Sequence, residues 1–127
     1  MTERPYQRLI AWKEAHILCL WIYAITEKYP STERFRLVDQ MCRSSSSAPT
    51  NIAEGSSKSS KKEQARFYET SICSLEELHY QCLLSRDLHY CSQEVFLDAD
   101  KRIGRVSFLC RRLRASCFFH PQSTPNL

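Results

Sequence analysis

The sequence predicts an all-α protein folded as an antiparallel up-down four-helix bundle. The 127 residues include only two glycines and five prolines, too few turn residues for a protein built from many short strands. Along four long segments, apolar and small side chains recur at alternating steps of three and four, which places them on one stripe of a helix. The connections between these segments are short, and short connections favour antiparallel neighbours.

The first two helices are expected to meet around Pro30. The first should end there and bury a stripe made of Trp12, Ala15, Cys19, Ile22, Thr26 and Tyr29. The second should open near Ser31-Thr32-Glu33 and bury Val38, Met41, Ser45, Ala48 and Ile52. Because the ring of Pro49 clashes with the carbonyl of residue 45, we expect a kink at Pro49. Gly55 is expected to end this helix in a left-handed conformation.

Serines mark the starts of the other two helices. Ser60 and Glu63 form a capping box that opens the third helix, which should bury Phe67, Ser71, Leu75, Leu78 and Cys82. The fourth should start near Ser92 and bury Ile103, Val106, Cys110, Leu113 and Cys117. The chain thus divides into an N-terminal arm (1–8), the four-helix bundle (9–117) and a flexible C-terminal tail (118–127).

The first helix is apolar nearly all round, although a bundle helix needs only one buried face. A thick, well-buried helix would explain this, but an exposed patch of this kind otherwise invites aggregation. We therefore expect self-association through an oligomer interface made of Ile17, Leu18, Trp21 and Ile25.

Cysteine usage and hydropathy indicate a cytoplasmic protein without a membrane segment. The seven cysteines form an odd set with no CxxC pair, which argues against a disulfide framework and favours a reducing compartment. The longest apolar run, from Ile17 to Ile25, is too short to span a bilayer, and no leader sequence is evident. The cluster of His79, Cys82, His89 and Cys91 has none of the recognised zinc spacings, so no metal or cofactor is expected.

The formal charge of +4 is modest, but the predicted topology distributes it unevenly. The start of the first helix, the second connection and the end of the fourth helix should share one end of the bundle. Eleven bases against five acids give that end a net charge of +6, and the opposite end has seven bases against nine acids, or −2. The eleven bases are Arg4, Arg8, Lys13, Lys58, Lys61, Lys62, Arg66, Arg105, Arg111, Arg112 and Arg114.

This polarity points to a polyanionic ligand, RNA or DNA. On the fourth helix, Phe108 falls beside bases that point away from the apolar stripe, a pattern that suits phosphate binding and base stacking. A solvated face that complements the helix dipole explains the same bases without a ligand. The candidate nucleic-acid-binding residues are Arg43, Lys58, Lys61, Lys62, Arg66, Lys101, Arg105, Arg111 and Arg112.

Catalysis has little support in the sequence, and no catalytic residues are expected. There is no glycine-rich phosphate loop and no nucleophile elbow. One spacing, Arg114 followed six residues later by His120, is similar to the motif of the HEPN ribonucleases, which are also helical bundles. It leaves a ribonuclease as an alternative.

Several segments together resemble a known family. They are Trp12-Lys13 with Ala15, Gln40 to Arg43, Ala48-Pro49-Thr50-Asn51-Ile52-Ala53-Glu54-Gly55, Lys58 to Glu63, and Ser74-Leu75-Glu76-Glu77-Leu78. This pattern is similar to the four-helix bundle proteins encoded by intervening sequences of bacterial large-subunit ribosomal RNA genes. Relatives of that family include the accessory variability determinant of diversity-generating retroelements.

The resemblance implies a non-enzymatic bundle that assembles as a homopentameric ring and presents a basic surface to nucleic acid. In the retroelement branch it also implies a reverse transcriptase as partner. The sequence therefore leads us to expect an oligomeric nucleic-acid-binding accessory or scaffold protein. A protein-binding adaptor without nucleic acid is the main alternative.

Overall fold

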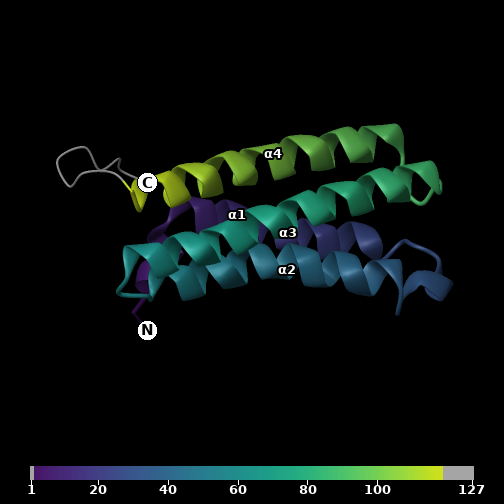
Figure 1. The fold of residues 1–127 in the computed structure, drawn as a ribbon. Coiled ribbons are helices and arrows are strands. Elements are labelled where there is room, and N and C mark those ends of the chain that lie inside the picture. The colour runs from purple at the N-terminus through teal and green to yellow at the C-terminus, as the bar shows by residue number, and fades with distance from the viewer. Residues whose placement is uncertain (1, 119–127) are drawn as a thin grey trace.

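Four α-helices make up most of the protein. The computed structural model describes residues 2–118, in which the helices are α1 (Ile10–Thr26), α2 (Leu37–Ser56), α3 (Lys61–Asp87) and α4 (Gln93–Ser116), with 3₁₀ turns η1 (Pro5–Arg8) and η2 (Ser31–Glu33). The helices run antiparallel, and the start of α1, the α2–α3 connection and the end of α4 lie at one end (Figure 1). The predicted all-helical class and four helices are confirmed. Of the expected tail, only Phe118 is described.

The core runs along the axis between the four helices. Its largest fully buried side chains include Leu18, Ile22, Met41, Ile52, Leu75 and Leu78. The α1 stripe differs from the expected one, because Ala11, Ala15, Leu18, Ile22 and Thr26 are buried while Trp12 and Cys19 lie half-buried at its edges. The apolar residues of α1 offer more than one stripe of helical spacing, so periodicity alone did not fix which stripe faces inward.

Helices α2 and α3 have the most extensive contact in the bundle, and serines make much of it. The Ser44 hydroxyl donates to Gln81 Oε1 at 2.6 Å, and the Ser71 hydroxyl donates to the carbonyl of Ala48 at 2.8 Å. The Ser47 and Ser74 hydroxyls lie 2.8 Å apart. Short side chains that bond across the contact let two helix backbones approach closely while leaving few buried polar groups unpaired.

Gly55 lies inside this close contact, and the expectation that it ends α2 in a left-handed conformation is wrong. No described glycine has a positive φ, and α2 continues to Ser56. A Cβ on Gly55 would lie 2.9 Å from Phe67 Cβ and 2.9 Å from Tyr68 Cε1. Gly55 therefore serves helix packing. The helix also continues through Pro49, so that residue does not end it, and a bend there stays a prediction.

The observed first residues of α3 and α4 agree with the predicted helix starts, whereas the observed start of α2 differs from the predicted one. Ser60 and Ser92 cap α3 and α4 by accepting from the backbone N–H of Glu63 and Val95. The second helix begins six residues later than expected, at Leu37, because Ser31–Glu33 forms a separate 3₁₀ turn. The carboxylate of Glu33 is buried there and accepts from the Tyr90 hydroxyl at 2.8 Å.

Candidate nucleic-acid interface

Contacts between α3 and α4 place two groups of bases close together at one end of the bundle. The Cys117 thiol lies 3.9 Å from Gln64 Oε1, and Arg114 forms an ion pair with Glu69. Burial raises the pKa of Cys117, and the nearby Lys61 opposes that rise. The start of α3 and the end of α4 are thus neighbours, as the topology in Figure 1 requires.

Most bases of this end have no acidic partner within residues 2–118. Arg8, Arg105 and Arg114 are paired with Glu3, Glu14 and Glu69. Six of the unpaired bases come from the α2–α3 connection, the start of α3 and the end of α4, and we call these six the basic end. They are Lys58, Lys61, Lys62, Arg66, Arg111 and Arg112.

The lysines at the start of α3 lie where the helix itself disfavours them. Lys61 and Lys62 are the first two residues of α3 and are exposed. The N-terminus of a helix carries partial positive charge, so a cation there loses an amount similar to the ~0.3–1 kcal/mol that an anion gains. Dipole complementarity, which accounts for bases at a helix C-terminus, does not account for these two.

Two aromatic rings accompany the basic end. The ammonium of Lys58 lies 5.1 Å from the centroid of Phe67, and the guanidinium of Arg112 lies 5.7 Å from the centroid of Phe108. Both distances fall within the range of cation–π contacts. Phe108 remains 52% exposed, so charge and an accessible aromatic ring are presented together.

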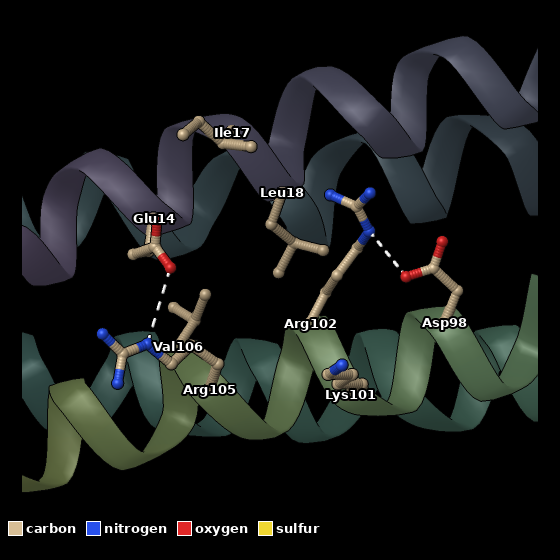
Figure 2. A pocket seen from close by; sticks show the side chains of 8 residues that line it. All are labelled: Glu14, Ile17, Leu18, Asp98, Lys101, Arg102, Arg105 and Val106. Atoms are coloured by element: carbon tan, nitrogen blue, oxygen red, sulfur yellow. Dashed lines mark hydrogen bonds and ion pairs between the residues drawn. The ribbon is translucent and has the colours of Figure 1, made fainter.

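The remaining candidate bases lie apart from the basic end. Arg43 on α2 pairs with Asp39 at 3.0 Å. Arg105 pairs with Glu14 at 3.5 Å across a groove of 360 Å³ between α1 and α4, and Arg102 pairs with Asp98 along the same groove (Figure 2). Lys101 lies on α4 between Asp98 and Arg102 and is exposed. The structure thus gathers six of the nine candidates and leaves Arg43, Lys101 and Arg105 elsewhere.

The outer face of α1 carries the apolar surface expected of an oligomer interface, with one correction. Leu18 is only 1% exposed and points into the space between α1 and α4 (Figure 2), so it belongs to the core and not to an interface. Ile17 is 51% exposed, whereas Trp21 and Ile25 are half-buried. Ile10, Leu20 and Tyr23 are also exposed. We call Ile10, Ile17, Leu20 and Tyr23 the α1 outer stripe.

Two of the residues considered for catalysis or metal binding, Arg114 and His79, have other partners. Arg114 is engaged by Glu69, and His120 lies outside the described residues. His79 Nε2 lies 2.8 Å from Asp100 Oδ1, and burial raises the pKa of Cys82 to about 12. No group of three His, Cys, Asp or Glu side chains within residues 2–118 is placed to hold a metal ion. No helix in the same range has the length and apolar character needed to cross a membrane.

Comparison with known proteins agrees with this architecture. The family model described as "23S rRNA-intervening sequence protein" matches residues 7–111. A comparison with curated proteins finds no match. Among solved structures, a protein of unknown function from the S23 ribosomal protein family of Bacteroides thetaiotaomicron is similar, with a TM-score of 0.74 and 16% identity over 83% of this chain and 98% of the other. The likeness to that structure, at 16% identity, shows the fold alone. Because the family model matches most of the bundle, the chain belongs to the 23S rRNA-intervening sequence protein family.

Proposed function

We propose that this protein is a non-enzymatic scaffold that binds RNA or DNA through the phosphates. The observation that carries the proposal is the basic end, six bases without acidic partners in the described chain, two of which stand against the dipole of their own helix. Exposed bases contribute little to the stability of a bundle. Binding by charge neutralisation discriminates little between sequences and depends strongly on salt.

The test compares two double variants that remove the same charge. Lys61→Gln with Lys62→Gln acts at the basic end, and Lys28→Gln with Arg34→Gln acts on exposed bases at the opposite end. Each phosphate contact on a single strand contributes about fivefold in 0.1 M salt, so the first pair should weaken RNA binding about 25-fold. The second pair should leave affinity unchanged. Fluorescence anisotropy with a labelled oligonucleotide measures both, and equal losses in the two variants would contradict a localised site.

We further propose that five copies of the chain assemble into a homopentameric ring through the α1 outer stripe. The exposed residues Ile17 and Leu20 lie three residues apart on one face of α1. Exposed apolar side chains that are neighbours on a helix favour burial of that face against another subunit. Ile17→Glu with Leu20→Glu should reduce the mass measured by light scattering to that of a monomer. Leu88→Glu, an exposed leucine beyond the end of α3, is the control. A wild-type monomer at micromolar concentration would contradict this assembly.

The cellular setting follows from the same proposal. A cytoplasmic location suits a protein whose partner is RNA, and a reverse transcriptase is the expected protein partner if the chain serves a retroelement. The whole end of one bundle that contains the basic end has a net charge of +6, so five subunits around one axis would present about +30. At distances up to a Debye length, this charge attracts nucleic acid or a polymerase bound to nucleic acid. Co-purification of a reverse transcriptase, encoded beside this gene, with the tagged protein tests that partner.

A protein-binding adaptor is the second candidate, and the exposed apolar side chains outside the α1 outer stripe favour it. Phe35 is 85% exposed and Tyr80 is 59% exposed. Partner binding that survives Lys61→Gln with Lys62→Gln would favour the adaptor over the scaffold. RNA cleavage that is lost in Arg114→Ala would favour the ribonuclease instead.

A further inference from the structure

A groove of 430 Å³ between α3 and α4 has features that the proposed phosphate contacts do not use. Its lining includes Glu76 and His79 from α3, and Asp100, Gly104, Phe108 and Arg111 from α4. Arg111 belongs to the basic end, and Arg112 lies against Phe108, so the groove adjoins the basic end.

Gly104 is what keeps this groove open. It lies in the interior of α4, where glycine costs about 1 kcal/mol relative to alanine. Nothing lies within 4 Å of the position that a Cβ would take, so close packing does not account for the glycine, nor does a positive φ. Side chains on an α-helix are tilted toward the N-terminal end of the helix. The ring of Phe108, four residues after Gly104, therefore lies over the helical turn that contains Gly104. The absent side chain leaves the ring accessible from the groove.

The charges in the groove decide which part of a nucleotide would fit. Glu76 and Asp100 carry negative charge and repel phosphates from the interior. Arg111 lines the groove and the guanidinium of Arg112 lies 5.7 Å from the Phe108 centroid, so these two bases attract phosphates beside it. An uncharged base fits the interior, where Phe108 offers a stacking surface. The His79–Asp100 pair, at 2.8 Å, and Glu76 offer hydrogen-bonding groups to a base edge.

We propose that this groove holds an unpaired nucleobase stacked on Phe108, while Arg111 and Arg112 contact the flanking phosphates. The ligand is then a single strand, because a base within a duplex does not reach a groove of this kind without leaving its stack. This inference rests on the proposed function and specifies it. The basic end supplies affinity for any nucleic acid, and the groove supplies the preference for unpaired nucleotides.

The first test measures the binding of a labelled oligouridine and of an RNA duplex of the same length. Wild-type protein should prefer the single strand. Phe108→Leu keeps an apolar side chain but loses the aromatic face, and it should weaken single-strand binding roughly 5- to 150-fold with little effect on the duplex. Phe108→Trp should retain the preference. Phe35→Leu, a change at an exposed aromatic residue far from the basic end, should change neither affinity.

The second test fills the groove without risk to the fold. Leucine is a good helix former, and at position 104 it would pair with Phe108 at an i, i+4 spacing. Gly104→Leu should therefore fold at least as stably as the wild type, yet lose the single-strand preference. Equal wild-type affinity for single strand and duplex, or unchanged single-strand binding in Phe108→Leu, would overturn the base groove while leaving the phosphate scaffold intact. Absence of any salt-dependent binding by the wild type would overturn both.

Discussion

The two glycines of this chain provide a matched test of the close contact between α2 and α3. Both lie inside helices without a positive φ, Gly55 in α2 and Gly104 in α4. A Cβ at Gly55 would lie 2.9 Å from Phe67 Cβ and from an edge atom of the buried Tyr68 ring, whereas a Cβ at Gly104 would meet nothing within 4 Å. The same substitution by alanine should therefore stabilise the protein at Gly104 and fail to stabilise it at Gly55.

The magnitudes follow from two contributions. Replacing a glycine with alanine stabilises a helix interior such as that around Gly104 by about 1 kcal/mol, and the gain is no larger at Gly55, the second-last residue of α2. At Gly55 the added methyl also overpacks the contact, which costs typically about 1–3 kcal/mol, because Phe67 Cβ moves only with the α3 backbone. Since the helix gain at Gly55 is no larger than at Gly104, Gly104→Ala should exceed Gly55→Ala in stability by at least about 1 kcal/mol.

Urea denaturation followed by circular dichroism measures this difference. Both variants and the wild type are compared at one protein concentration, because association makes apparent stability concentration-dependent. The urea concentration at the unfolding midpoint should be higher for Gly104→Ala than for the wild type. The midpoint of Gly55→Ala should be lower than that of Gly104→Ala, and the dependence of the unfolding free energy on urea should be unchanged. Equal stabilisation by both substitutions would refute the close packing of α2 against α3 at Gly55.

Three further predictions concern other parts of the fold. His89 follows α3 with a φ of 63°, so His89→Gly should raise the free energy of unfolding by about 1 kcal/mol in the same urea assay. The hydrogen bond from Tyr90 holds the pKa of Glu33 below its ordinary value of 4.5. The contribution of ionised Glu33 to the free energy of unfolding should therefore be complete above pH 4.5 and be lost as pH falls through the lowered pKa. When the free energy of unfolding is measured against pH, Glu33→Gln should show a smaller decrease at acid pH than the wild type. Among the thiols, exposed Cys73 should react first with iodoacetamide, whereas Cys110, whose pKa burial raises to about 12, should react only on unfolding; fast labelling of Cys110 would contradict a closed core.

Periodicity predicted the helices well because most of them offer only one apolar stripe. The five residues expected to be buried on the fourth helix, from Ile103 to Cys117, are all buried. Phe96, Ala99, Ser107 and Leu109 are buried as well and were not predicted. In α1 several stripes compete, so Leu18 was assigned to an interface although it lies in the core. The start of α2 was placed too early, since Glu33 satisfies Leu37 N–H through a tertiary arrangement that also needs Tyr90. Local sequence patterns contain no information on that contact.

The candidate site was predictable to the extent that topology determines it. Antiparallel order was enough to bring Lys61 and Arg112 to one end of the bundle. It was not enough to show that Arg105 has an acidic partner, because the Arg105–Glu14 pair joins residues far apart in the sequence. The Arg43–Asp39 pair, in contrast, has an i, i+4 spacing on one helix and was available from the sequence. Gly104 received no role from the sequence. A glycine in the interior of a strongly periodic helix, one turn before an outward phenylalanine, was the available signal.

The salt dependence of RNA binding tests the central claim most directly. If all six bases of the basic end contact phosphates of a single strand, a plot of the logarithm of the association constant against the logarithm of salt concentration should have a slope of about −4. Lys61→Gln with Lys62→Gln should reduce the steepness of that slope by about 1.4. A slope near zero for the wild type, or a slope that the double variant leaves unchanged, would contradict phosphate binding at the basic end.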